Sequence, residues 1–222
     1  MNAGILDSLL NLLFPPKCPF CGTVLDQIGI CNGCRSKLPW AEGSEALRNS
    51  PGGLRVCAPL RYEGLAREGV LDLKFHGRMG AAEPLGELVA ACAAEWYSGE
   101  FDMVTWVPVS KQRLRKRGYD QAELLARSAC RAWDVRPVRL LVKTVDNPAQ
   151  SGLHEAAARR ANVLGVYEAA EPTKTAGRRI LLVDDVCTTG STLAECAQVL
   201  REAGAAEVLC AAVALTSRPD GK

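Results

Sequence analysis

Two adjacent acids and a hydroxyl-rich turn provide the residue types needed to bind a phosphorylated sugar. The segment ILLVDDVCTTGST covers residues 180–192, and its first four residues have the length and branching of a buried parallel strand. The apolar spacing after Gly190 predicts a helix over residues 191–203. The turn is therefore expected at a helix N-terminus, where unpaired backbone N–H groups and the helix dipole favour an anion.

The predicted phosphate ligands are the backbone amides and hydroxyls of this turn. Gly190 lets the backbone approach an anion closely, and the full candidate set is Thr188, Thr189, Gly190, Ser191 and Thr192. Asp184 and Asp185 would repel a phosphate, so we expect them to face sugar hydroxyls or a bound cation. The alternative is the acidic strand of another nucleotide fold. That alternative needs a GxxxxGK[ST] loop or a GxGxxG fingerprint, and the sequence contains neither.

Four cysteines near the N-terminus have the spacing of a metal site. Cys18 and Cys21 form one CxxC pair, and Cys31 and Cys34 form a second pair after nine intervening residues. Four thiolates in this pattern complete a closed tetrahedral zinc site. Two disulfides or an iron–sulfur cluster are the alternatives. We favour structural Zn²⁺, because no secretory signal precedes the pairs and the sequence shows no redox partner site.

A basic segment follows a predicted strand that ends near Pro108. Five basic residues fall within residues 111–117. A departing pyrophosphate needs cations, so Arg113 and Arg117 are the candidate pyrophosphate ligands, with Ser110 and Lys111 near the turn at the strand end. A solvated basic turn, or a surface that holds nucleic-acid phosphates, would use the same charges.

Strand-like runs alternate with helical patterns along most of the chain, which predicts an α/β fold with a parallel doubly wound sheet. Ligands of such sheets bind beyond the carboxyl ends of the strands, where Asp184 and Thr188 are expected. The polar, glycine-rich residues 42–53 are interpreted as a linker or surface loop. This divides the chain into an N-terminal helix with a zinc-binding module at 1–45 and a larger domain at 46–222. Strands are predicted at 55–60, 104–109, 135–142, 180–183 and 208–215, and helices at 65–75, 84–96, 121–133 and 191–203.

Composition limits the possible classes of protein. The 222 residues are 48% hydrophobic and carry a net charge of +2, so a core is easily buried and bulk charge does not indicate a nucleic-acid binder. Ile5, Leu9, Leu12 and Leu13 fall on one face of a predicted helix that ends before Pro15. No apolar run approaches the roughly 20 residues of a membrane-spanning helix. We therefore expect a cytoplasmic protein without a transmembrane segment.

The segment at 180–192 closely resembles the signature of type I phosphoribosyltransferases, which bind 5-phosphoribosyl 1-pyrophosphate. The resemblance implies that Asp184 and Asp185 hold the ribose hydroxyls and that the turn from Thr188 to Thr192 holds the 5′-phosphate. It also implies a bound Mg²⁺ that bridges the ribose and the pyrophosphate. Asp184 and Asp185 would then be the catalytic residues, with Asp185 as the candidate base.

Nearly the whole chain is similar to the ComF (ComFC/GntX-like) family, which joins a four-cysteine zinc motif to a phosphoribosyltransferase domain. The shared segments are LLFPPKCPFC with CNGC, LKFHGR, VPVSKQRLRKRGYDQAELLA, QSGLHEAAARRAN at 150–162 and the segment at 180–192. One departure is an extra residue between Leu153 and Asn162, which leaves Arg159 and Arg160 without an assigned role. The resemblance implies a part in natural transformation and DNA uptake.

Two functions from different classes therefore remain open. The chain is expected to be a phosphoribosyltransferase with an unspecified acceptor, or a non-catalytic competence module that binds single-stranded DNA and uses its sugar-phosphate pocket to sense a ligand. Single-stranded DNA and the competence machinery are the partners implied by the resemblance.

Overall fold

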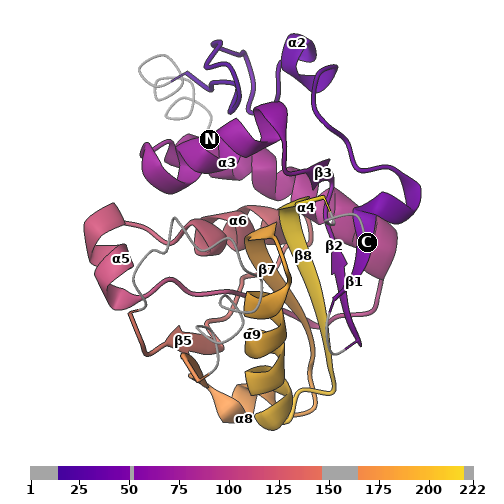
Figure 1. Cartoon of the computed structure of the whole chain (residues 1–222), viewed down its shortest axis with the longest axis vertical. Helices are drawn as coiled ribbons and strands as arrows, with labels where there is room; N and C mark the ends of the chain where they lie inside the picture. Colours follow the sequence, from indigo (N-terminus) through magenta and orange to yellow (C-terminus); the bar gives the residue numbers. More distant parts are fainter. Residues whose placement is uncertain (1–14, 51–52, 147–164, 218–222) are drawn as a thin grey trace, which may run out of the picture.

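A small cysteine-bearing module lies on an α/β domain in the computed structural model, which describes residues 15–50, 53–146 and 165–217 (Figure 1). The predicted N-terminal helix and the segment at 150–162 lie outside the described residues. The main sheet has the order β1-β2-β8-β7-β4, and a short strand, β3, also pairs with β8. Its strands are β1 (Leu47–Ser50), β2 (Leu54–Cys57), β3 (Leu60–Arg61), β4 (Met103–Trp106), β7 (Arg179–Cys187) and β8 (Glu207–Leu215).

The sheet is parallel except at one edge. β2, β8, β7 and β4 run parallel to one another, and only β1 pairs antiparallel, with β2. Helices connect the parallel strands, as crossovers of this type require. They are α2 (Asn32–Arg35), α3 (Gly64–Phe75), α4 (Ala82–Tyr97), α5 (Lys111–Arg117), α6 (Gln121–Arg131), α8 (Pro172–Thr175) and α9 (Ser191–Glu202). The predicted α/β doubly wound architecture is confirmed.

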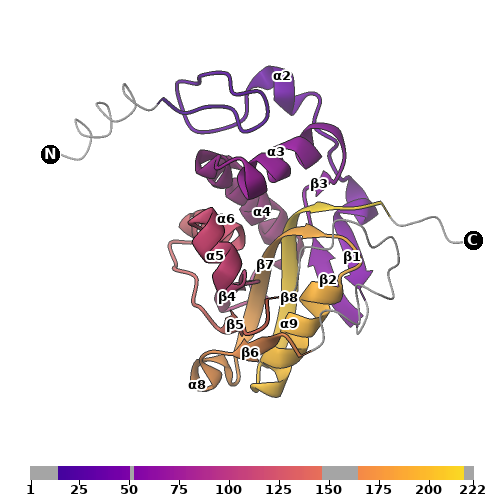
Figure 2. The ribbon, with the colours of Figure 1, turned by 60° about the vertical axis from the view of Figure 1, so that its left-hand side comes forward.

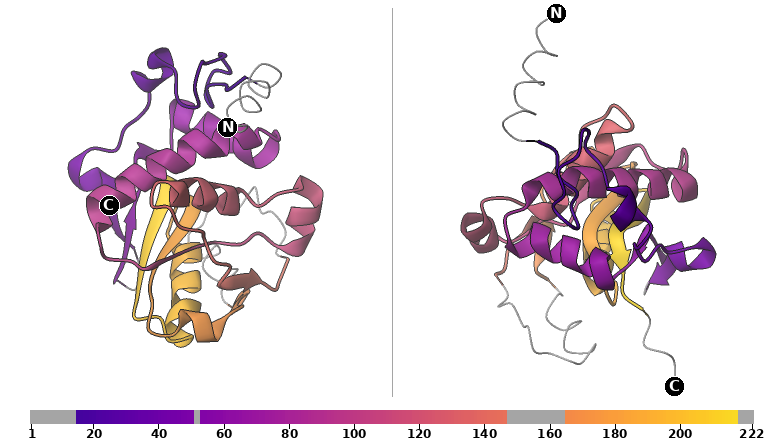
Figure 3. Two further views of the ribbon diagram at one scale, coloured as in Figure 1. Left: turned by 180° about the vertical axis from the view of Figure 1, so that it is seen from behind. Right: turned by 90° about the horizontal axis from the view of Figure 1, so that it is seen from above.

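The central strands are buried on both faces because their side chains alternate between two cores. Leu181 and Val183 of β7 pack in the core that α4 and α6 cover. Ile180 and Leu182 pack in the core that α9 covers. Figure 3 shows α4 and α6 on the side of the sheet opposite α9. This two-sided burial explains why the central strands are continuous apolar runs in the sequence.

Helix α3 lies between the cysteine-bearing module and the sheet (Figure 2). It follows β3, and the N–H of Tyr62 donates to the carbonyl of Leu215 at the end of β8 at 2.7 Å. Ala66, Val70 and Leu73 of α3 are completely buried. Lys74 in the last turn of α3 pairs with Asp185, so the helix ends beside the carboxyl end of β7.

The four long helices predicted from apolar spacing are confirmed, with bounds that differ by up to two residues. The predicted strand at 180–183 is too short. β7 continues to Cys187, because β8 pairs with it as far as Cys187 opposite Leu215. Asp184 and Asp185 therefore belong to the strand and do not begin a loop.

The interpretation of residues 42–53 as a linker is wrong for most of that segment. Gly43–Ala46 forms a 3-10 turn and Leu47–Ser50 forms the edge strand β1. A four-residue polar strand at a sheet edge lacks the apolar run that marks a central strand, so sequence patterns do not reveal it. The predicted strand at 135–142 is also largely wrong. Only β5 (Leu141–Lys143) forms there, and it pairs antiparallel with β6 (Tyr167–Ala169) outside the main sheet.

The basic residues after Pro108 form a helix, α5, where we expected a turn. Ser110 caps its N-terminus by accepting a hydrogen bond from the N–H of Arg113. Gly118 ends it with a φ of +84°, in the left-handed region that favours glycine. Apolar spacing does not predict this helix, because five of its seven residues are basic and none of its side chains is buried.

Candidate functional site

A polar cavity of about 270 Å³ opens at the carboxyl ends of β4 and β7. Its wall contains Asp184 and Asp185 from β7 together with Thr188 and Thr192 from the turn that leads into α9. Loops from adjacent parallel strands meet at this edge of an open sheet, which is where such folds bind ligands. The structure therefore brings the predicted acidic pair and part of the predicted phosphate turn to one cavity.

Both acids are buried and hydrogen-bonded. Only 9% of Asp184 and 4% of Asp185 is exposed. Lys74 Nζ lies 2.7 Å from Asp185 Oδ1, and Gln121 Nε2 donates to Asp185 Oδ2 at 2.8 Å. The backbone N–H of Asp185 donates to Asp184 Oδ1 at 2.8 Å. Partners of this kind are required because an unpaired buried carboxylate costs several kcal/mol.

The proximity of the two carboxylates changes how Asp184 and Lys74 titrate. Burial, and then the charge of Asp185, raise the pKa of Asp184 well above its ordinary value, although Lys74 opposes the shift. Burial alone would lower the pKa of Lys74, but the charge and hydrogen bond of Asp185 outweigh it and raise that pKa. Lys74 therefore stays charged and compensates for the acidic pair.

Gly190 shapes the turn before α9. Its φ of +78° lies in the left-handed region, and a Cβ at this position would lie 2.6 Å from Ser50 Oγ. The hydroxyls of Thr189 and Ser191 are hydrogen-bonded to each other at 2.7 Å. The N–H of Ser191 donates to Thr189 Oγ1 at 3.3 Å. The next N–H groups of α9 have no intrahelical acceptor, so the turn offers donors to an anion.

Strand β1 supports this turn, and no motif in the sequence indicated that contact. Arg48 Nη1 donates to the carbonyl of Thr188 at 2.9 Å, and Arg48 Nη2 donates to the carbonyl of Thr216. The hydroxyl of Thr216 donates to the same Thr188 carbonyl at 3.3 Å. Arg48 lies 140 positions from Thr188 in the chain, so only the fold reveals that an edge strand fixes the turn.

The predicted pyrophosphate residues are distributed differently around the cavity. Arg113 lines it, together with Lys143 of β5. Burial, and then the charge of Arg113, lower the pKa of Lys143. Ser110 is buried as the cap of α5, and Lys111 is exposed outside the cavity wall.

Arg117 interacts with neighbouring residues of the site and does not line the cavity. Its guanidinium lies 5.4 Å from the ring centroid of Phe75 and donates to Gln121 Oε1. Gln121 in turn donates to Asp185. Arg117 is therefore connected to the acidic pair through one intervening side chain.

Several residues of the cavity wall were not among the predicted ligands. They are Tyr62, Lys74, Gln121, Lys143 and Tyr167. Lys74 and Gln121 lie in the segments LKFHGR and RGYDQ, whose residue types alone do not assign a role. Lys143 and Tyr167 come from β5 and β6, which the sequence does not place near the acids.

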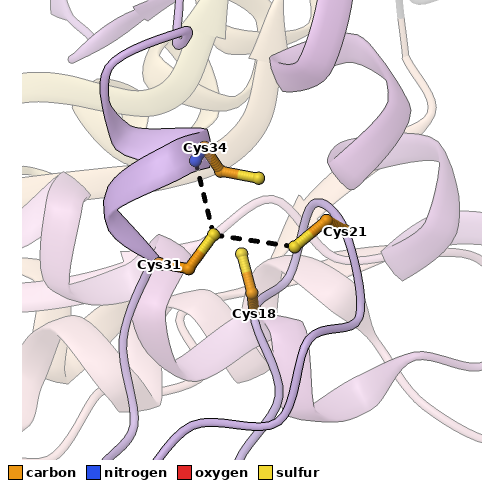
Figure 4. Close-up of side chains that lie close together, drawn as sticks. All are labelled: Cys18, Cys21, Cys31 and Cys34. Carbon is orange, nitrogen blue, oxygen red and sulfur yellow. Dashed lines mark hydrogen bonds between the residues drawn. The ribbon is translucent and has the colours of Figure 1, made fainter.

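The four N-terminal cysteines converge as predicted (Figure 4). Their sulfur atoms all lie within 4.8 Å of one another, and the sulfurs of Cys21 and Cys31 are 3.6 Å apart. A tetrahedron with Zn–S bonds of about 2.3 Å separates its sulfurs by about 3.8 Å, so the cluster fits Zn²⁺. All four cysteines are free in the structure, as ligands of a metal must be.

Two family models match separate parts of the chain. Residues 115–222 match the phosphoribosyl transferase domain family and residues 9–45 match the double zinc ribbon domain family. Competence protein F of Haemophilus influenzae is 39% identical over 46% of this chain and 45% of its own length. DNA utilization protein YhgH of Salmonella typhimurium is 29% identical over 86% of each chain, and Competence protein ComFC of Bacillus subtilis is 26% identical over 85% of this chain and 73% of its own.

The chain belongs to the ComF family. Its four-cysteine cluster lies within the residues that match the double zinc ribbon domain, which supports structural zinc. Its mostly parallel α/β sheet has the architecture that the resemblance implied, and the second half of the chain matches the phosphoribosyl transferase domain. The match spans about half the length of the first curated relatives, such as 45% of the Haemophilus protein. Among the described residues, none of the helices has the length and apolar character needed to cross a membrane.

The zinc assignment predicts a metal-dependent fold. We expect about one Zn²⁺ per chain, and we expect a chelator to lower the thermal transition, because a structural zinc site contributes directly to folding free energy. Cys18→Ser/Cys21→Ser should lose the metal, measured by atomic emission. Cys130→Ala, in the buried part of α6, is the matched control and should keep it. A transition that does not respond to the chelator would contradict a folding role.

The raised pKa of Asp184 predicts an unusual pH dependence of stability. The folded chain binds more protons than the unfolded chain from about pH 3.8 up to the raised pKa, so stability falls as pH rises through this window. Asp184→Asn removes the charge and keeps an acceptor oxygen. It should therefore raise the melting temperature near pH 7, by about 2–4 °C per kcal/mol gained, and the gain should disappear toward about pH 4.

The control for Asp184→Asn is Asp102→Asn, for which the opposite sign is expected. Hydrogen bonds from Arg179 lower the pKa of Asp102, so its contribution to stability is present at neutral pH and is lost as pH falls through the lowered pKa. Melting curves of both variants across the acidic range test the pair. If both variants were less stable than the native protein near pH 7, the raised pKa of Asp184 would be contradicted.

Proposed function

We propose that this ComF-family chain binds 5-phosphoribosyl 1-pyrophosphate in the cavity at the ends of β4 and β7. The observation that supports this most strongly is the position of two adjacent carboxylates and the N-terminal turn of α9 on one cavity wall. Carboxylates accept hydrogen bonds from sugar hydroxyls, and the turn offers donors to a phosphate. In this proposal the ribose lies over Asp184 and Asp185 and its 5′-phosphate lies at the turn from Thr188 to Thr192.

Two cationic side chains in the same cavity support the placement of the pyrophosphate. Arg113 and Lys143 both line the cavity, and the pKa of Lys143 is lowered by burial and by the charge of Arg113. A pyrophosphate between them would relieve this repulsion between two positive groups. Ser110, Lys111 and Arg117 lie around the same strand end. Of these, Arg117 would act by orienting Gln121 toward Asp185.

Mg²⁺ fits the oxygen donors of this cavity. Hard divalent cations prefer carboxylate and hydroxyl oxygens. Both oxygens of Asp185 already accept from Lys74 and Gln121, so Asp184 is the residue we assign to the metal, directly or through water. Bound Mg²⁺ would neutralise charge on the pyrophosphate.

The same arrangement suits transfer of the phosphoribosyl group to an acceptor. Departure of pyrophosphate leaves positive charge on the sugar ring and negative charge on the leaving group. Asp184 and Asp185 would stabilise the positive charge on the sugar ring. Arg113 and Lys143 would stabilise the negative charge on the pyrophosphate. The described cavity wall contains no feature that selects a particular acceptor. The alternative is a pocket that senses the ligand without turnover, and release of pyrophosphate distinguishes transfer from sensing.

Calorimetry with 5-phosphoribosyl 1-pyrophosphate and Mg²⁺ tests the proposal. We expect Asp184→Asn/Asp185→Asn to weaken binding at least about tenfold, which corresponds to about 1.4 kcal/mol, because the sugar loses two charged acceptors. Asp26→Asn removes one exposed carboxylate of the zinc module and should leave the affinity unchanged. Equal affinities for the native protein and the double variant would refute the assignment of the acids.

We also propose that the chain acts in DNA uptake, with α5 as a contact for single-stranded DNA in the cytoplasm. Two observations favour this second function. Lys111, Arg115 and Lys116 of α5 are exposed, and α5 buries no side chain. The names of the relatives, Competence protein F, Competence protein ComFC and DNA utilization protein YhgH, refer to the same biology. The competence machinery would be the partner.

A salt titration of DNA binding tests the role of α5. Each phosphate contact on a single strand contributes about 0.7 to the slope of log affinity against log salt, so replacing three contacts should reduce the slope by about 2. The test variant is Lys111→Gln/Arg115→Gln/Lys116→Gln. The matched control, Lys174→Gln/Arg178→Gln/Arg201→Gln, removes the same number of exposed basic residues near α8 and the end of α9. If both variants keep the native slope, α5 does not contact the DNA.

A further inference from the structure

Helix α3 joins the zinc module to the acidic pair. On the module side, Phe20 is buried against Gly69, where an added Cβ would lie 2.8 Å from the ring. Phe20 lies between the ligands Cys18 and Cys21 in the chain, so the turn that binds the metal is also the turn that contacts α3. Figure 2 shows α3 between this module and the ends of the central strands.

On the cavity side, the last turn of α3 carries Lys74. Its ammonium lies 2.7 Å from Asp185 Oδ1, and 22% of its side chain is exposed. Lys74 follows Leu73 directly, and Leu73 is completely buried and accepts a hydrogen bond from Tyr119 through its carbonyl. The backbone from which Lys74 extends is therefore fixed by the packing of α3, and the ion pair with Asp185 places the ammonium.

We propose that Lys74 is a positioning residue that holds Asp185 toward the sugar hydroxyls, and that Zn²⁺ in the four-cysteine cluster holds Lys74 in place through Phe20 and α3. This inference rests on the proposed phosphoribosyl-pyrophosphate site. It assigns to the zinc module a second role beyond stabilising its own fold, which is control of ligand affinity at the acidic pair.

The physical basis is the cost of leaving charge uncompensated in the two clusters that α3 connects, the four cysteines through Phe20 at Gly69 and the acidic pair through Lys74. Four thiolates within 4.8 Å need a cation between them, and without it the sulfurs take up protons and lose the common ligand that holds them together. Removal of the metal therefore loosens the turn from Cys18 to Cys21 and releases Phe20 from Gly69. α3 then loses the packing of the Phe20 ring, and Lys74 is held less firmly. The negative charge of Asp185 is therefore only partly neutralised beside Asp184.

Thermodynamic linkage makes the effect reciprocal. If zinc raises the affinity for the sugar phosphate by some factor, the sugar phosphate raises the affinity for zinc by the same factor. Couplings between sites in one protein typically correspond to factors of about 5 to 150. We expect about tenfold here, because the route contains one aromatic contact and one ion pair.

The first experiment measures Lys74 directly and needs no ligand. The full chain is treated with an amine-labelling reagent, and the labelling rate of Lys74 is followed by mass spectrometry together with hydrogen exchange over α3. In the zinc-loaded protein Lys74 should react more slowly than the exposed Lys174. After zinc removal its labelling should accelerate about tenfold and exchange in the last turn of α3 should rise. Unchanged labelling and exchange would overturn the inference.

Variants at position 20 test the same route in zinc-loaded protein, so the test remains valid if the zinc-free protein unfolds. Phe20→Ala keeps all four cysteines but removes the ring from Gly69, so the zinc-loaded variant should show the fast Lys74 labelling. Phe20→Leu restores an apolar contact and should return the rate toward the native value. Val24→Ala is the matched control, because Val24 is a 56% exposed apolar residue of the same module. Native labelling in zinc-loaded Phe20→Ala would overturn the route through α3.

The second experiment separates this inference from the proposed function. Calorimetry with 5-phosphoribosyl 1-pyrophosphate and Mg²⁺ should give about tenfold weaker binding to zinc-loaded Phe20→Ala than to the native protein, and Lys74→Met should bind at least as weakly as Phe20→Ala. Equal affinity in Phe20→Ala and the native protein would overturn the coupling and leave the proposed site intact. No binding to the native protein, with Lys74 labelling still dependent on zinc, would remove the proposed function and leave the link between zinc and Lys74.

Discussion

Two neighbouring carboxylates buried at the end of the central strand are the constraint on which the site depends. Asp184 and Asp185 repel each other in a medium that screens charge poorly, so each needs fixed partners. Lys74 and Gln121 provide them for Asp185 from two different helices. The ends of α3 and α6 must therefore meet at β7, and this meeting creates the polar cavity beside the acids.

The rest of the domain holds this arrangement in place from several sides. The edge strand β1 holds the turn before α9 through Arg48, and β5 brings Lys143 to the cavity. α3 has the zinc module on one side and carries Lys74 on the other. Each support comes from a different part of the chain, so the cavity is a property of the assembled domain and not of any single motif.

Sequence patterns predicted the parts of the structure that depend on local periodicity and on motif chemistry. The four long helices, the central strands and the cysteine cluster follow from apolar spacing and ligand spacing, and the structure contains all of them. The linker at 42–53 and the strand at 135–142 were wrong. In both cases short, partly polar strands are stabilised by partners elsewhere in the chain, which a local pattern cannot show.

By itself, the sequence determined the strand, acid pair and glycine turn at 180–192 and the four thiolates, because these chemistries depend on residue types at short spacing. Only the tertiary structure decided which side chains complete the site. Lys74 lies 111 positions before Asp185 in the chain, yet their charged atoms are 2.7 Å apart. The physical reason is that a buried charge is compensated through space, by whichever residue the packed helices bring within a few ångströms.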